Sequence, residues 1–315
     1  MSDLRVRVPA STSNLGSGFD CIGMAIGRWL DVRARVDAAS DKLRIFRSGE
    51  LATLSCNPDD DLIWRGIVAG SSALRRAPPK GVRLDASSDI PVARGLGSSA
   101  AALIAGVLLA NEIFQGGLDS EAIIDIAASL EGHPDNVAPS ALGGAVLSVR
   151  TGGHHYASVP ITVHDALRFV FLVPDFEIRT AAARAALPAD VAFETAVTAA
   201  SRAAALVMGL QTGNERLLTA ALDDVLHVPV RRSLVRGYDE ATNAAVAAGA
   251  IGATLSGSGS TIVAVATVRT ASDVCEAGVR AWRVAGVMAD GFVCAAESRG
   301  AQVELEITAG NAREQ

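Results

Sequence analysis

A glycine- and serine-rich turn followed at once by a long apolar helix is the feature that most constrains this chain. Residues 91–101 have the sequence PVARGLGSSAA, and the apolar run continues to Ala110. Two glycines two positions apart can take positive φ, which lets the backbone approach an anion closely. Free N–H groups and the dipole at the start of the following helix favour phosphate oxygens. The sequence therefore predicts a phosphate-binding loop at Gly95–Ser99 and a helix over 99–114.

The loop by itself leaves its chemistry open. A glycine turn with a serine N-cap occurs at many helices and needs no ligand. The loop also lacks the lysine of the GxxxxGK(S/T) motif, and Ala100 stands where GxGxxG has its third glycine. Ser98 and Ser99 are the two hydroxyls that could reach Mg²⁺, a hard cation that prefers oxygen ligands.

Composition excludes several classes of function. The formal net charge is −6, and no run of basic residues is longer than a pair, so we expect no nucleic-acid partner. The longest apolar stretch, 100–110, is too short to span a bilayer, and no charged-then-apolar segment opens the chain. Four cysteines lie far apart without a CxxC pair, which argues against a disulfide framework or a zinc site. We expect a cytoplasmic protein without a membrane partner.

Strands and helices are mixed without a regular βαβ rhythm, which indicates an α+β fold. A glycine-, serine- and asparagine-rich loop is expected over 11–18. Hydrophobic periodicity predicts strands over 4–8, 31–36, 82–86, 143–149, 169–174, 254–255, 262–267 and 303–307, with further strand character at Val293. It predicts helices over 62–75, 99–114, 119–131, 181–187, 193–208, 215–226, 241–248 and 271–285. The polar stretch near 152–165 suggests two domains, 1–158 and 159–315.

The full string at 91–101 resembles the P-x3-G-L-G-S-S-A-A motif of the GHMP kinase superfamily, named for galactokinase, homoserine kinase, mevalonate kinase and phosphomevalonate kinase. Two other segments are similar to the motifs that flank it in that family. They are Pro9–Asp20 (PASTSNLGSGFD) and Gly252–Thr261 (GATLSGSGST). The three segments span nearly the whole chain. The resemblance implies a kinase that uses ATP and Mg²⁺. It also implies an N-terminal domain like domain 2 of ribosomal protein S5 and a ferredoxin-like C-terminal domain.

By this resemblance the whole central loop binds ATP. Its residues are Pro91, Val92, Ala93, Arg94, Gly95, Leu96, Gly97, Ser98, Ser99, Ala100 and Ala101. The third motif implies a second loop that faces the phosphates through Ser256, Gly257 and Gly259. That loop departs from the family's common SGAGPT, with Ser258 in place of alanine and Ser260 in place of proline.

The expected adenine pocket also departs from the family pattern. Asp61 stands where an asparagine is frequent in the family, and this leaves the contacts to the base open. Trp64, three residues later, is consistent with stacking on adenine and also with packing inside a helix core.

The string EGHPDNVAP at 131–139 resembles the homoserine kinase branch of the superfamily. On local pattern alone it is equally consistent with a polar helix end stopped by Pro134. The resemblance implies that Glu131 holds Mg²⁺ together with Ser98. It also implies a substrate site, to which this string contributes His133, Asp135 and Asn136.

Further substrate residues are assigned in the same way. Arg184 and Arg231 match the positions of an arginine clamp, and a bidentate guanidinium suits a carboxylate. Arg179 and Arg232 are the alternatives in a neighbouring register. Asn14 and Asp20 match the family's amino-acid pocket, with Asp20 orienting the attacking hydroxyl.

The activity implied is ATP-dependent phosphorylation of the δ-hydroxyl of L-homoserine to O-phospho-L-homoserine in threonine biosynthesis, by a homodimer. We expect direct transfer without a covalent enzyme intermediate, with Asp20 and Asp135 as the candidates for a general base. Two alternatives remain: another GHMP kinase, such as a mevalonate-type enzyme, or a catalytically silent sensor on the same fold. A silent sensor should have lost Glu131 or the loop serines, and both are present here.

Overall fold

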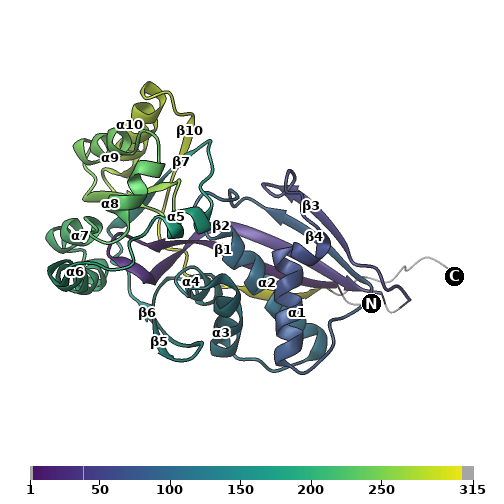
Figure 1. The fold of residues 1–315 in the computed structure, drawn as a ribbon. Helices are drawn as coiled ribbons and strands as arrows, with labels where there is room; N and C mark the ends of the chain where they lie inside the picture. Colours follow the sequence, from purple (N-terminus) through teal and green to yellow (C-terminus); the bar gives the residue numbers. More distant parts are fainter. Residues whose placement is uncertain (1–2, 38, 307–315) are drawn as a thin grey trace.

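Two sheets, each covered by helices, make up the molecule (Figure 1). The computed structural model describes residues 3–37 and 39–306. Within these ranges the first sheet has seven strands, and β2 lies at its centre, paired with β1, β4 and β5. The strands are β1 (Asp3–Asn14), β2 (Gly18–Val36), β3 (Arg44–Gly49), β4 (Val82–Ser88), β5 (Ala145–Gly152), β6 (His155–Ile161) and β11 (Gln302–Glu306).

Helices between β3 and β5 cover one face of the first sheet (Figure 1). They are the 3₁₀ turn η1 (Pro58–Asp60), α1 (Leu62–Ala73), α2 (Ser98–Phe114), α3 (Ser120–Glu131) and α4 (Val137–Leu142). Helix α2 lies at the centre of this layer, in contact with β1, α1 and α3. A helix surrounded in this way has to be apolar on every side, which explains its composition. No helix in the described ranges combines the length and the apolar character that a membrane crossing requires.

The second sheet has the antiparallel order β10-β7-β9-β8, which is the ferredoxin-like arrangement. Its strands are β7 (Leu167–Pro174), β8 (Gly252–Leu255), β9 (Ile262–Thr267) and β10 (Ala289–Cys294). The helices of this half are α5 (Thr180–Ala185), α6 (Phe193–Thr212), α7 (Glu215–Leu222), α8 (Val228–Arg231), the 3₁₀ turn η2 (Arg232–Leu234), α9 (Tyr238–Ala247) and α10 (Ala271–Val284). The predicted α+β class and the two-domain fold are confirmed.

Strand β7 is buried on both faces, which joins the two halves. Phe169 and Phe171 belong to the core of the first sheet and its helices. Val170 and Leu172 face the other way, into the core formed with α9 and α10. Because neither face meets water over Phe169–Leu172, this part of the strand is continuously apolar instead of alternating.

The first hairpin differs from its predicted form. A loop was expected over 11–18, but β1 runs to Asn14 and β2 begins at Gly18. The polar residues 11–14 at the end of β1 are buried and hydrogen-bonded; for example, Thr12 Oγ1 lies 2.9 Å from Ser256 Oγ. Buried partners therefore satisfy side chains that by themselves suggested a loop.

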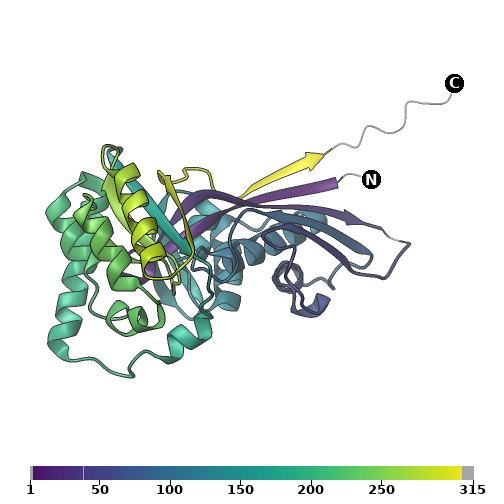
Figure 2. The same cartoon turned by 90° about the horizontal axis from the view of Figure 1, so that it is seen from above.

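The predicted domain limits also need correction. The division at 158/159 falls inside β6, which pairs with β5 in the first sheet, so the chain leaves this sheet only after Ile161. Strand β11 then returns to the first sheet and pairs with β1, as Figure 2 shows, so the last described strand does not belong to the C-terminal unit.

Other differences are local. Strands β3 and β6 were not predicted, and the helix expected over 215–226 ends at Leu222. Ile307, the last residue of the predicted final strand, lies outside the described residues.

Helices α1 and α2 approach closely at a pair of glycines, which generates a prediction for stability. A Cβ built on Gly106 would lie 2.0 Å from the carbonyl oxygen of Ile63, and one built on Gly66 would lie 2.4 Å from that of Leu103. Gly106→Ala gains about 1 kcal/mol of helix propensity, but overpacking against backbone costs about 1–3 kcal/mol or more. We expect a net decrease in the free energy of unfolding, measured by denaturant titration.

The matched control is Gly152→Ala, where no atom lies within 4 Å of the added Cβ. We expect this variant to unfold like the parent chain. A Gly106→Ala protein more stable than the parent would contradict the close packing of the two helices.

Candidate active site

The predicted phosphate loop is held between the two halves of the molecule. Gly95 and Gly97 both have positive φ, +73° and +69°. A Cβ on Gly95 would lie 2.2 Å from the carbonyl oxygen of Ser256, and one on Gly97 would lie 2.2 Å from Ser11 Oγ. Ser256 Oγ also donates a hydrogen bond of 2.6 Å to the carbonyl of Gly95. Both glycines are therefore required by conformation and by space. The N-terminal motif (9–20) and the C-terminal motif (252–261) hold the central loop in place.

The start of α2 is left open to an anion. Gly97 is the N-cap residue and has no side chain to accept from the first N–H groups of the helix. Unpartnered N–H groups and the helix dipole favour a negatively charged ligand. The loop residues from Ala93 to Ser99 line one cavity together with Gly257 and Ser258 of the third motif. Of the three residues predicted to face the phosphates, Gly257 lines this cavity, whereas Ser256 and Gly259 are not among its lining residues.

Glu131 lies at the end of α3 and reaches the start of α2. Its Oε1 accepts a 2.6 Å hydrogen bond from Ser99 Oγ. The sequence assigned Ser98 as its partner in holding a metal ion, whereas the structure pairs it with Ser99. Ser98 lines the same cavity. That Ser98 is the hydroxyl ligand of a metal ion therefore stays a prediction.

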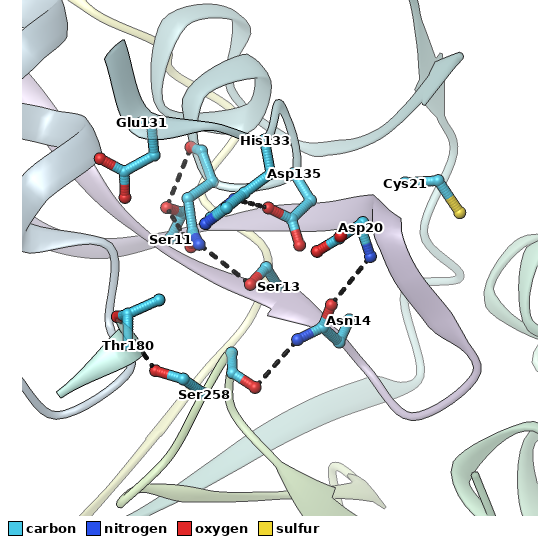
Figure 3. A network of polar contacts seen from close by, with 12 residues as sticks. Ser11, Ser13, Asn14, Asp20, Cys21, Glu131, His133, Asp135, Thr180 and Ser258 are labelled. Carbon is cyan, nitrogen blue, oxygen red and sulfur yellow. Dashed lines mark hydrogen bonds and ion pairs between the residues drawn. The ribbon is translucent and has the colours of Figure 1, made fainter. Parts of the chain in front are cut away.

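His133, Asp135 and Asp20 form a compact charged cluster beside Glu131. His133 Nδ1 lies 2.5 Å from Asp135 Oδ1, and ligand atoms of all three residues lie within 4.8 Å of one another. Figure 3 shows Asp135 between the other two side chains. Burial by itself would lower the pKa of His133. The charge and hydrogen bond of Asp135, with Glu131 and Asp20 nearby, instead raise it to about 9, so the ring is an imidazolium at neutral pH.

Asp20 is ionised and faces an arginine. Its carboxylate accepts two hydrogen bonds of 2.9 Å from Arg184. Arg184 lies on α5, in the C-terminal half of the molecule. Burial would raise the pKa of Asp20, but the Arg184 pair, followed by His133 and Arg231, lowers it below its usual value. The cavity therefore presents fixed charges of both signs.

Asn14 links the first hairpin to the third motif. Its Nδ2 donates to the carbonyl of Gly257 at 2.9 Å, and its Oδ1 accepts from the N–H of Asp20 at 3.0 Å (Figure 3). Asn14 lines the cavity as predicted. Its amide is engaged by protein groups at both ends, so its contribution in this structure is to position Asp20.

Arg231 is almost fully buried, with 2 % of its surface exposed. Nε donates to the carbonyl of Ala183 at 3.1 Å, and its guanidinium lies 5.2 Å from the ring centroid of Phe19. Arg184 and Arg231 both line the cavity. The alternatives Arg179 and Arg232 do not: Arg179 is the N-cap residue of α5, and Arg232 lies 3.7 Å from Asp239.

Several hydroxyl groups of the site were missed by sequence reasoning. Ser11 Oγ donates to Asn136 at 3.0 Å, and Asn136 Nδ2 donates to Ser13 Oγ at 2.9 Å. Thr180 Oγ1 lies 3.3 Å from Ser258 Oγ, and both residues line the cavity. The signals in the sequence were Ser258, which replaces the alanine of the family motif, and the motif Pro9–Asp20, which contains Ser11 and Ser13.

A second, more apolar cavity adjoins the start of α2. It is lined by Leu30, Arg47, Leu51, Leu54, Cys56, Asp60, Asp61, Leu62, Ile63, Val92, Ser98 and Ala102. Asp61 caps α1 by accepting from the N–H of Ile63 at 2.9 Å and pairs with Arg47 at 2.6 Å. Trp64 is not among the lining residues and packs against the core, so its packing role is the one that the structure supports. Ser98 lines both cavities.

Comparison with known proteins agrees with this geometry. The family model for the GHMP kinases N terminal domain matches residues 61–144, and the model for GHMP kinases C terminal matches residues 206–283. The homoserine kinase of Trichormus variabilis is 38% identical over 92% of this chain and 95% of its own length. That of Desulfitobacterium hafniense is 38% identical over 95% of this chain and 99% of its own length. The chain belongs to the homoserine kinase family of the GHMP kinases.

Solved structures support the same placement. A homoserine kinase from Cytophaga hutchinsonii superposes with a TM-score of 0.85 at 27% identity, covering 96% of this chain and 97% of the other. A Leishmania major mevalonate kinase, solved in complex with R-mevalonate, gives a TM-score of 0.70 at 17% identity over 92% and 95%, which shows the shared fold alone. As a GHMP kinase, this chain is an ATP-using enzyme.

The His133 cluster generates a prediction for the ligand-free kinase in metal-free buffer. NMR of the ring nitrogens should show an imidazolium at pH 7.5 that titrates near pH 9. Replacing the partner by Asp135→Asn should lower that pKa. A neutral His133 at pH 7.5 would contradict the charge assignment.

The sign of the linked stability follows from the raised pKa. Ionised His133 favours the folded state fully below the unfolded value of 6.5, and this contribution is lost as pH rises through about 9. The stability advantage of the parent chain over His133→Asn should therefore shrink across that range.

Proposed function

We propose that this kinase transfers the γ-phosphoryl group of ATP to the δ-hydroxyl of L-homoserine, giving O-phospho-L-homoserine for threonine biosynthesis. One observation carries the proposal: a single cavity joins the phosphate loop to charged groups of both signs. Asp20 and Asp135 suit an α-ammonium group, and Arg184 and Arg231 suit an α-carboxylate. The homoserine kinases that this chain resembles over almost its full length support the same substrate.

The triphosphate is proposed to lie along Gly95–Ser99, against the open N–H groups at the start of α2. The adenine ring then occupies the adjoining apolar cavity, which shares Ser98 with the phosphate end. Main-chain donors fixed before the reaction are well suited to charge that shifts during transfer.

Mg²⁺ is the proposed cation at the junction of α2 and α3. A carboxylate and a hydroxyl oxygen meet there, at Glu131 and Ser99, with Ser98 beside them. These are hard oxygen donors of the kind that Mg²⁺ prefers. Held there by Glu131 and a loop serine, Mg²⁺ would offset negative charge on the phosphate groups.

Positioning is the main task left for the protein groups. Phosphoryl transfer passes through a loose transition state, so alignment of the hydroxyl with the phosphorus and stabilisation of charge dominate. Asp20 is ionised and is proposed to accept a hydrogen bond from the attacking hydroxyl. Asp135 is the other candidate for a general base.

The alternatives fit the site less well. Mevalonate has a carboxylate but no ammonium group, so it offers no cation to the acceptor oxygens of Asp20 and Asp135. A silent sensor is disfavoured because Glu131, Ser98 and Ser99 all face the cavity. A cytoplasmic location stays a prediction from composition, and a homodimeric assembly stays a prediction from the family resemblance.

The direct test is an assay of purified protein with ATP, Mg²⁺ and L-homoserine, mevalonate or galactose. We expect O-phosphohomoserine as the product and no turnover of the other two substrates. Glu131→Gln is the control for site chemistry, and kcat should fall on the order of 10²- to 10³-fold because several kcal/mol of charge stabilisation are lost. Efficient turnover of mevalonate would overturn the substrate assignment.

Arg231→Ala tests the carboxylate contact. A charged hydrogen bond contributes about 1.5–3 kcal/mol, so KM for homoserine should rise about 10- to 150-fold while KM for ATP changes little. Steady-state kinetics with each substrate varied in turn measure both constants. Arg232→Ala, on the neighbouring exposed residue, is the matched control and should behave like the parent enzyme. Unchanged saturation by homoserine in Arg231→Ala would contradict the assignment.

A further inference from the structure

His227 is a completely buried polar residue directly behind the substrate cavity. Its exposed fraction is 0 %, and it stands one turn before Arg231 along the chain. Its ring stacks on Phe19, with centroids 4.9 Å apart. Neither the phosphate loop nor the acidic cluster accounts for a histidine at this position.

The two ring nitrogens of His227 have different partners, which fixes the tautomer. Nδ1 lies 3.3 Å from Nη1 of Arg231, and a guanidinium can only donate, so Nδ1 must be unprotonated. Nε2 lies 3.2 Å from the carbonyl oxygen of Gly16, which can only accept, so Nε2 must carry the hydrogen. Both contacts are satisfied only by the neutral Nε2–H ring.

Asp224 holds the segment that carries both residues. Its Oδ2 accepts from the N–H groups of Leu226, His227 and Val228 at 3.0, 2.7 and 2.8 Å. Oδ2 also lies 3.8 Å from His227 Nε2, too far for a hydrogen bond, so Gly16 is the partner of that nitrogen. Burial, with the nearby charge of Arg231, lowers the pKa of His227 and keeps its ring neutral.

These contacts determine which N–H groups of Arg231 remain available to a ligand in the cavity. Nε is used by Ala183 and one hydrogen of Nη1 by His227, while the guanidinium rests over Phe19. In the part of the chain that the structure describes, no protein group accepts from Nη2, and Arg231 lines the cavity.

We propose that His227 is a positioning residue for substrate recognition. By accepting a hydrogen bond through Nδ1, it turns the remaining donor edge of Arg231 toward the substrate carboxylate. The inference rests on the proposed role of Arg231 and adds a requirement for one acceptor atom behind it. A planar guanidinium group that is oriented before the substrate binds loses less rotamer freedom when it pairs with the carboxylate.

Two amide variants separate this role from simple packing. In His227→Asn, the side-chain oxygen lies near the position of Nδ1 and keeps the acceptor for Arg231, but the bond to Gly16 is lost. In His227→Gln, the side-chain nitrogen lies near the position of Nε2 and keeps the donor to Gly16, but the acceptor for Arg231 is lost. His154→Gln, at an exposed position, is the control for histidine replacement in general.

The expected result is an unequal effect on KM for homoserine. Loss of a charged hydrogen bond should raise this KM about tenfold or more in His227→Gln, with kcat and KM for ATP within about twofold. His227→Asn should stay within about threefold of the parent enzyme in all three constants, since its acceptor is retained. If His227→Asn is the more impaired variant, or if both variants raise the two KM values equally, the positioning role is wrong.

Two further measurements keep the tests separate. If Arg231→Ala leaves homoserine saturation unchanged, the proposed carboxylate contact fails, whatever His227 does. If Arg231→Ala weakens homoserine binding but both His227 variants match the parent enzyme, only the positioning role fails. Should the variants not fold, NMR of the intact enzyme decides the matter: a neutral Nε2–H ring at pH 7 supports the proposal, and an Nδ1–H ring or an imidazolium overturns it.

Discussion

The contact between the phosphate loop and the loop of the third motif is the constraint on which the rest of the site depends. Gly95 approaches the backbone of Ser256 so closely that no side chain fits between them. The same loop meets β1 through Ser11 on its other side. Two segments more than 160 residues apart therefore have to be in place before the start of α2 can face an anion. The geometry of this loop therefore depends on both halves of the molecule.

Opposite charges are fixed around the cavity that this contact creates. Asp20 pairs with Arg184 across the two halves, and His133 pairs with Asp135 on one loop. Burial of the His133–Asp135 pair would be costly if the two groups were not paired and hydrogen-bonded. The charges that we propose to bind the substrate are thus held by one another in the structure, and buried Arg231 with its partner His227 extends that arrangement behind the cavity.

Local sequence was sufficient for much of the fold and for part of the site. Helices such as α2 and α10 and strands such as β9 are marked by periodicity and apolar runs, and the Gly95–Ser99 turn by its glycines. The strands missed, β3 and β6, have exposed and polar residues along much of their length, so no strong hydrophobic pattern distinguished them. Serines 11–13 suggested a loop because their partners come from distant segments that local pattern does not include.

The sequence alone was sufficient to predict a phosphate-binding loop at Gly95–Ser99, because positive φ, hydroxyls and a helix start are properties of neighbouring residues. It also determined which polar side chains were candidates for the substrate. Only the tertiary structure decided their pairing: Ser99 with Glu131, Arg184 with Asp20, and His227 with Arg231. The reason is physical, since hydrogen bonds and charge interactions act over a few ångströms in space, and the distance between two residues along the chain does not fix that separation.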